Sequence, residues 1–380
     1  MEQRHRATSI LEFLVAKNPQ IRPAPTPRTQ NQPSQSNTRT GGHWAPVAFE
    51  DWVEFDPKIL KTIYGGWLWK VVSKDRGDSD AGLIDYPFLS PFDLQVCDEA
   101  STACVIHKWN QTIVTSSLMG VEEFHPSIWR AAKGMNNWNQ PSDPALRPDG
   151  GAISMDQSSS SEAMFLERLP KDYKCNHKWD SRVIRRGGEF VNNEGKWVTE
   201  IKSKHNKVLP IRQVYTYCVE WGCRYGCIIS TKEAFIFRIK PCSVSPELSG
   251  DEQVKKALKE NGLMEYVTVP WDNYSDSKAA KLPQKWTMNL ALWFVHILAG
   301  NYHTVAKEYP SLSAEKLVMS IDPSTRKSQS SRKEGELKQK PGNQEYPKIT
   351  QSTRKRARGD NFDTSSSLDP DYLQASQVCD

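Results

Sequence analysis

All thirteen tryptophans of this 380-residue chain fall between Trp44 and Trp293, and this confines the aromatic core to the middle of the sequence. Residues 18–43 are rich in Pro, Gln, Ser and Thr, and the residues from about 322 onward are rich in Ser, Lys, Arg and Asp. Such segments bury too little apolar surface to offset their chain entropy. We therefore expect disordered tails at 1–43 and 316–380, and one folded region at 44–315 with its core at about 98–300.

The distribution of charge favours a polyanionic partner. The formal net charge is +5, and Lys and Arg crowd residues 171–207 and 326–358. This pattern is typical of nucleic-acid binding. The basic run in the second region predicts nuclear import, with a solvated charge run and a cytoplasmic protein as the alternative; its cations are Arg354, Lys355, Arg356 and Arg358. No apolar stretch approaches the ~20 residues of a membrane-spanning helix, so we expect no membrane partner.

Strand-like and helix-like segments alternate along the folded region, which predicts an α/β layer architecture. We expect helices at 98–114 with Asp98 as the N-cap, from Pro210 onward, at 251–261 and at 286–299. We expect an antiparallel pair of strands at 150–155 and 163–169, and a tight hairpin of strands at 225–230 and 234–239.

Two carboxylates and a lysine near the first strand pair are candidate active-site residues. Asp149 follows a proline where the first strand begins, and Asp172 and Lys174 are two residues apart. On an extended segment, side chains two apart point to one face, and paired strands can bring two carboxylates close together. Carboxylate oxygens are ligands that Mg²⁺ prefers, and a lysine can stabilise charge on a phosphate. The pattern predicts a Mg²⁺ or Mn²⁺ site for phosphodiester hydrolysis.

A second pair of polar residues falls on the helix that begins at Pro210. Gln213 and Tyr217 are four residues apart and so share one helix face, where they can bond to a substrate phosphate or support the lysine. Core packing of Tyr217 with an exposed Gln213 is the alternative.

A rival set of residues has the same spacing. Glu200 and Lys202 lie two apart in a segment, 197–202, that alternates like a strand, and Asp180 precedes Glu200 by twenty residues. No proline precedes Asp180, and the stretch around it is basic and polar, which favours the set Asp149, Asp172 and Lys174. Pro170 counts in the other direction, because proline inside a central strand removes a hydrogen bond of the ladder.

The order of these short motifs resembles the PD-(D/E)XK nuclease-like proteins of fungi, with the Gln-x-x-x-Tyr helix of RecB-type nucleases. The matching segments are Arg147-Pro148-Asp149, Asp172-Tyr173-Lys174, Lys178-Trp179, Arg212-Gln213 with Tyr217, 224–229, 235–238 and 290–293, and, upstream, Trp109-Asn110. They span about residues 98–299. No single motif is specific; the ordered series carries the resemblance.

The resemblance implies a restriction-endonuclease-like core, with a mixed central sheet flanked by helices, that hydrolyses DNA or RNA. It implies Asp149 and Asp172 as metal ligands, Lys174 as the catalytic lysine, and Gln213 and Tyr217 as accessory residues. Glu99 could supply a further acidic ligand, with Asp98 as an equal candidate. A catalytically silent nucleic-acid-binding module on the same fold is the alternative function. The sequence sets no oligomeric state.

Overall fold

The computed structural model describes residues 6–23, 43–75, 84–131, 134–135, 137, 146–155, 165–243, 250–275 and 281–315. They fall within the first of two compact units, Met1–Pro323; the second, Ser324–Asp380, with the expected import run, lies outside the described residues. No helix in the described part is long and apolar enough to cross a membrane.

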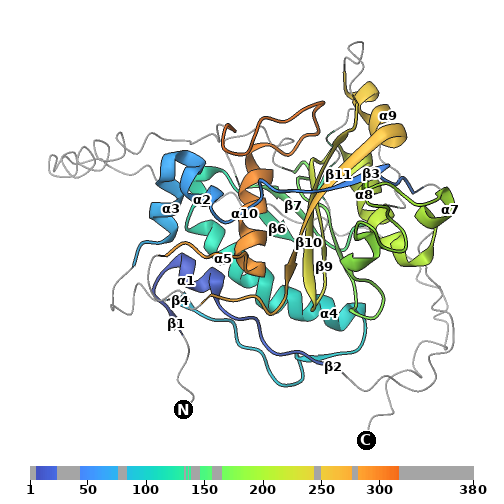
Figure 1. Cartoon of the computed structure of the whole chain (residues 1–380). Helices are drawn as coiled ribbons and strands as arrows, with labels where there is room; N and C mark the ends of the chain where they lie inside the picture. The colour runs from blue at the N-terminus through green and yellow to red at the C-terminus, as the bar shows by residue number, and fades with distance from the viewer. Residues whose placement is uncertain are drawn as a thin grey trace, which may run out of the picture. The chain divides into compact units, whose positions relative to one another are not determined.

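A five-stranded sheet of mixed orientation forms the centre of the fold (Figure 1). Its strands, in spatial order, are β3 (Ala48–Asp51), β11 (Gly262–Pro270), β10 (Glu233–Pro241), β9 (Tyr225–Ile229) and β8 (Lys171–Tyr173). The three middle strands pair antiparallel, whereas the two edge strands pair parallel with their neighbours. The predicted hairpin is confirmed as β9 and β10.

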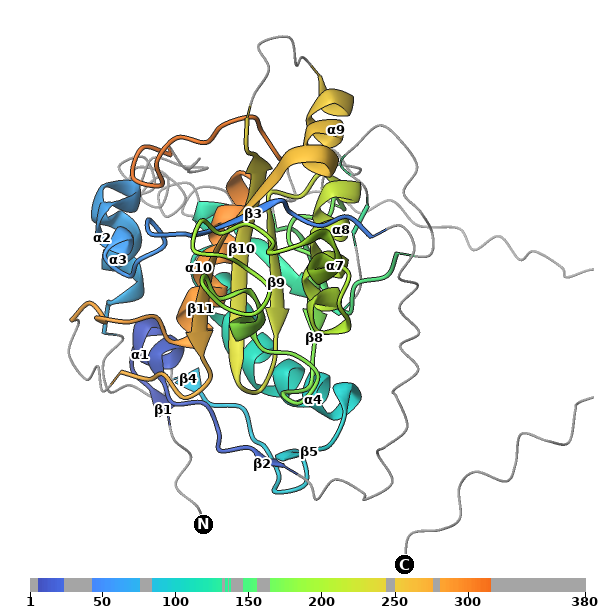
Figure 2. The ribbon, with the colours of Figure 1, turned by 45° about the vertical axis from the view of Figure 1, so that its right-hand side comes forward.

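Helices cover both faces of this sheet, and side chains alternate between the two. Ile229 and Ile236 pack with α4 (Glu99–Ile106), α5 (Thr112–Met119) and α10 (Met288–Asn301). Ile228 and Phe235 pack on the opposite face with residues of α8 (Leu209–Trp221) and α9 (Asp251–Asn261). Figure 2 shows α8 beside the sheet. All four expected helices are confirmed, although the first is divided by a π-helical turn, η3 (His107–Gln111), before α5. The fold is therefore mixed α/β, with a mixed central sheet flanked by helices.

The expected boundary at residue 44 was wrong for the part of the N-terminal segment that the structure describes. Helix α1 (Ile10–Val15) begins at the N-cap Ser9 and packs against α5 and α10. Five of its six residues are apolar and buried, so a short helix gains enough burial to dock. On either side, β1 (Arg6–Ala7) pairs with β4 (Ile84–Asp85), and β2 (Arg22–Pro23) pairs with β5 (Gln95–Val96).

The expected strand pair at 150–155 and 163–169 was also wrong in its pairing. β7 (Gly151–Ser154) exists, but its ladder partner is the antiparallel strand β6 (Ser127–Arg130). Of 163–169, the described residues 165–169 form no regular strand; Leu166 makes an isolated bridge with Met135. The remaining elements are α2 (Ile59–Thr62), η1 (Ile63–Gly66), α3 (Trp67–Val72), η4 (Glu122–Phe124), η5 (Ser181–Ile184), α7 (Glu200–Ser203) and η6 (Asn206–Val208).

Candidate functional site

Edge strand β8 carries the acidic residue and leads into the lysine of the expected site. It begins directly after Pro170, whose carbonyl accepts a hydrogen bond from the Cys227 N–H at 3.1 Å. Proline is tolerated at the start of an edge strand, which removes the objection that Pro170 raised. Asp172 is fully buried, and its Oδ2 lies 2.7 Å from Nζ of Lys174. The two side chains share a face, as their spacing predicts.

Asp149 is brought to β8 from the opposite side by backbone pairing. Gly150 and Lys171 form an isolated antiparallel bridge, and Oδ2 of Asp149 accepts a hydrogen bond from the Tyr173 N–H at 2.8 Å. The Asp149 side chain is solvent-exposed and lies within hydrogen-bonding reach of the buried Asp172 carboxyl. The structure thus brings together the first three predicted residues, Asp149, Asp172 and Lys174.

Burial sets the protonation of this group. It raises the pKa of Asp172 well above its usual value, and the neighbouring Asp149 raises it further while Lys174 opposes the shift. Burial lowers the pKa of Lys174, but its attraction to Asp172 outweighs this and raises the pKa to about 12. Apart from Lys174, no donor in the described part bonds to the Asp172 carboxyl oxygens. The site therefore has a positively charged lysine beside two carboxyl groups, Asp149 and Asp172, that can share one proton.

The first turn of α4 places Glu99 beside the lysine. Asp98 caps this helix, and its Oδ1 accepts a hydrogen bond from the Ser101 N–H at 2.7 Å. The Asp98 carboxylate is therefore engaged in capping. Oε1 of Glu99 lies 3.7 Å from Nζ of Lys174 and 3.5 Å from Nζ of Lys178. Among the described residues, no three His, Cys, Asp or Glu side chains are grouped so as to hold a metal ion. Glu99 therefore contacts the site at Lys174. The two carboxyl groups that lie close together are those of Asp149 and Asp172.

The Gln-x-x-x-Tyr pair of α8 also reaches this site. Gln213 Nε2 donates to Tyr217 OH at 2.7 Å, and that hydroxyl donates to the Arg147 carbonyl at 3.1 Å. Burial raises the pKa of Tyr217, and the charges of Asp172 and Asp149 raise it further. Tyr217 therefore lies near both carboxyl groups and holds the backbone two residues before Asp149.

The rival residues occupy different surroundings. Glu200 and Lys202 lie in the exposed helix α7, and the expected strand at 197–202 was wrong. Glu200 pairs with Lys204 at 3.1 Å, and Lys202 lies 3.8 Å from Glu189. Asp180 caps η5 and pairs with Arg182 and Lys232. No hydrogen bond or ion pair between described residues joins Asp180 to Glu200 or Lys202.

Sequence reasoning missed the buried polar cluster behind β8. Glu167 is fully buried, and its carboxylate accepts hydrogen bonds from the N–H groups of Gly134 (2.6 Å), Ala152 (2.8 Å) and Leu169 (2.9 Å). A Cβ at Gly151 would lie 2.2 Å from Oε2, so glycine lets this carboxylate approach the chain. Burial lowers the pKa of the nearby Lys171 to about 8, although the charge of Glu167 opposes the shift. The available signal in the sequence was Glu167 and Lys171, two residues of opposite charge four apart in a segment without helical periodicity.

A polar contact on Tyr173 was missed as well. Its hydroxyl accepts a hydrogen bond from Trp129 Nε1 at 3.1 Å and lies 3.0 Å from Nε2 of His107. A Cβ at Gly150 would lie 2.6 Å from the same hydroxyl. These contacts fix the residue between Asp172 and Lys174, so they help to hold the register of β8 against Asp149.

The raised pKa of Asp172 predicts a pH-dependent stability. Because its folded pKa lies above its unfolded value near 3.8, the folded state binds more protons between the two values, and the wild type loses stability as pH rises through this interval. Asp172→Asn removes this loss, so in EDTA its stability relative to wild type should increase with pH. Urea unfolding of both proteins over a pH series measures the difference; two parallel stability curves would contradict the prediction.

No protein-family model, curated protein or solved structure that was compared matches this chain.

Proposed function

We propose that this chain is a nuclear, Mg²⁺- or Mn²⁺-dependent nuclease with a restriction-endonuclease-like core, and that it hydrolyses phosphodiester bonds of DNA or RNA. One observation carries the proposal: Asp149, Asp172 and Lys174, which resemble a PD-(D/E)XK motif in order and spacing, meet at the edge of the central sheet. The contact of Tyr217 with the backbone of Arg147 supports it, because the Gln-x-x-x-Tyr helix then reaches the same site.

The chemistry of the donors fits a divalent cation. Asp149 and Asp172 present hard carboxylate oxygens, and the Asp172 oxygens lack any donor other than Lys174 in the described part. Two adjacent carboxyl groups repel each other when both are ionised, which favours either a shared proton or a cation. Asp149 and Asp172 would hold Mg²⁺, which when bound lowers the pKa of water and offsets charge on the phosphate.

Lys174 supplies a fixed positive charge at the same place. Its side chain is largely buried, and its ammonium group stays protonated at neutral pH because the pKa is raised to about 12. It cannot act as a general base in that state. It can donate a hydrogen bond to a phosphate oxygen as negative charge develops there.

Gln213 and Tyr217 have a positioning role. The Tyr217 hydroxyl is occupied by Gln213 and by the Arg147 carbonyl, and the residue is only 3 % exposed. Its function is to hold the chain before Pro148, so that Asp149 stays against β8.

A catalytically silent nucleic-acid-binding module is the second candidate. It is favoured by the direct ion pair of Asp172 with Lys174, which neutralises the carboxylate internally. The finding that Asp149 and Asp172 gain no third acidic partner within the described residues favours it too.

Metal binding separates the two candidates. Mg²⁺ should raise the melting temperature of the wild type, because binding at about 100 times Kd adds about 2.7 kcal/mol to the stability of the folded state. Asp172→Ala should abolish most of this rise, whereas Lys202→Ala should keep it. The measurement is thermal unfolding of the full chain in Mg²⁺, Mn²⁺ and EDTA, beside cleavage of plasmid, single-stranded DNA and RNA. Equal metal responses of wild type and Asp172→Ala, with no cleavage, would favour the silent module.

A further inference from the structure

The segment between Lys174 and Gln213 carries most of the positive excess of the chain. Residues 176–207 contain eight Lys and Arg against four Asp and Glu, whereas the whole chain has a formal charge of +5. The segment is folded through η5, α7 and η6, and buried Phe190 anchors it in the core. Nζ of Lys202 and of Lys207 lie 5.2 Å and 5.9 Å from the Phe190 ring centre. These cations are therefore held on a structured surface.

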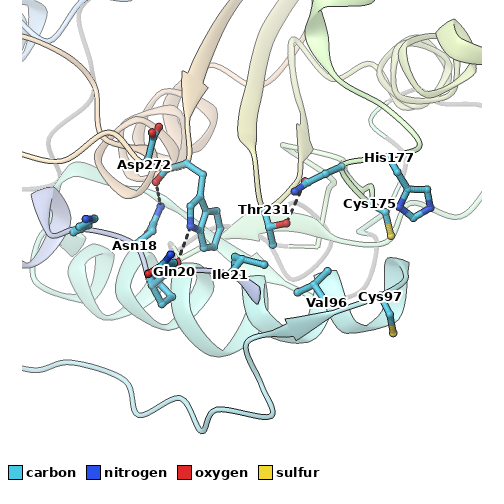
Figure 3. A pocket seen from close by; sticks show the side chains of 13 residues that line it. Asn18, Gln20, Ile21, Val96, Cys97, Cys175, His177, Thr231 and Asp272 are labelled. Atoms are coloured by element: carbon cyan, nitrogen blue, oxygen red, sulfur yellow. Dashed lines mark hydrogen bonds between the residues drawn. The ribbon is translucent and has the colours of Figure 1, made fainter. Parts of the chain in front are cut away.

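Two cavities meet at the start of this segment. The smaller, of about 320 Å³, is lined by residues of the segment, and its Lys and Arg residues are Lys178, Arg182 and Lys207. The larger, of about 620 Å³, is lined in part by Ile21, Val96 and Trp271. Asn176 and His177 line both cavities, so the two adjoin at these residues, and together they are called the groove below. Figure 3 shows the larger cavity, with Asn18 and Asp272 at one end and Cys175 and His177 at the other.

The groove adjoins the carboxyl site. Cys175, which directly follows Lys174, lines the larger cavity. Lys178 lines the smaller cavity and lies 3.5 Å from the Glu99 carboxylate, which is itself 3.7 Å from Lys174. Glu99 thus lies between Lys174 and a cation of the groove.

The acidic residues of the smaller cavity already have cationic partners. Asp180 pairs with Arg182 and Lys232 at 2.5 Å each, and Glu189 lies 3.8 Å from both Lys202 and Lys207. Three cations, Lys178, Arg182 and Lys207, line the cavity against these two carboxylates, so it keeps a small positive excess that suits phosphate groups. The larger cavity presents apolar and aromatic side chains, which suit the face of a base.

We infer that this groove binds a single-stranded polynucleotide, with phosphates along Lys178, Arg182 and Lys207, and an unpaired base in the larger cavity, stacked on His177. The assignment rests on the proposed function, since it names the substrate class of the same site. Both cavities have volumes typical of small-ligand sites, and only a base released from pairing can enter such a space. In a duplex the bases remain stacked inside the helix, so the larger cavity would stay empty.

Direct binding tests this assignment independently of cleavage. The full chain is titrated in EDTA against labelled oligo(dT), oligo(rU) and a duplex, each of about 12 nucleotides or base pairs, within the range of single-strand sites. Tighter binding of either single strand than of the duplex is expected. His177→Ala should weaken it about 5-fold, the low end of stacking contributions, and His177→Trp should restore it.

A matched pair of lysines tests the phosphate path. Lys207 and Lys204 have side chains that are 60 % and 63 % exposed, and only Lys207 lines the smaller cavity. Lys207→Gln should weaken single-strand binding severalfold and lower the slope of log affinity against log salt by about 0.7. Lys204→Gln, with the same loss of charge, should leave both unchanged.

The outcomes separate the groove from the nuclease. Equal affinity for duplex and single strand, or equal effects of Lys207→Gln and Lys204→Gln, would overturn the groove even if metal-dependent cleavage were observed. The expected binding pattern without cleavage in Mg²⁺ or Mn²⁺ would support the groove and contradict the nuclease.

Discussion

Lys174→Ala is expected to lower metal-dependent cleavage by roughly two to three orders of magnitude, the range seen when a preorganised charge donor is removed from an active site. The reason is its place: Nζ lies 2.7 Å from the buried Asp172, and burial weakens the screening of this ion pair by water. The measurement is the initial rate of plasmid nicking and of single-strand cleavage in Mg²⁺. Folding is checked by thermal unfolding of the same samples, since the variant leaves Asp172 without its cation.

Lys202→Ala is the matched control. Lys202 belongs to the rival set, yet it lies on exposed helix α7 and pairs only weakly, at 3.8 Å, with Glu189. Its removal should leave the rate unchanged. Loss of cleavage in Lys202→Ala with full activity in Lys174→Ala would move the active site away from β8 and contradict the proposed assignment.

Glu167→Ala is expected to cost about 3–5 kcal/mol of folding free energy, because each buried N–H group left without its acceptor costs about 1–3 kcal/mol. The change leaves the N–H groups of Gly134, Ala152 and Leu169 without their acceptor. It also removes the negative charge that offsets burial of Lys171. Each of these groups is buried or partly buried, so water cannot fully replace the carboxylate. Urea unfolding with a two-state fit measures the loss.

Glu167→Gln separates the hydrogen bonds from the charge. The amide oxygen can keep the bonds that Oε1 now accepts from Ala152 and Leu169, while the NH₂ group cannot accept from Gly134. Its loss of stability should therefore lie between those of wild type and Glu167→Ala. Equal stability of all three proteins would show that this cluster does not hold β7 and β8 together.

The candidate site was predictable in its residues and only partly in its geometry. The spacing of Asp172 and Lys174 sets a common face on any extended segment, and the structure places both on one side of β8. The spacing of Gln213 and Tyr217 likewise sets a common face on α8, where they bond to each other. Both results depend on local periodicity, which sequence carries directly.

Which of the two sets of acidic residues comes together depends on contacts between distant segments. Asp149 and Asp180 each precede a second carboxylate by about twenty residues, and spacing alone cannot show which pair meets. The bridge of Gly150 with Lys171 brings Asp149 to β8. The segment 197–202 alternates like a strand, but Thr199 caps a short helix there, so Glu200 and Lys202 do not share a strand face.

The sequence by itself determined the elements with strong periodicity and clear end signals. These are α8 with Pro210 in its first turn, the buried helix α10 and the hairpin of β9 and β10. In each of them, the spacing of apolar residues within the segment predicts which faces are buried. Only the tertiary structure decided that β7 pairs with β6 and that α1 docks into the core. It also decided that Glu167 accepts hydrogen bonds from three backbone N–H groups behind β8. These contacts join segments whose separation in sequence carries no signal, because they depend on which surfaces remain unpaired after the central sheet has formed.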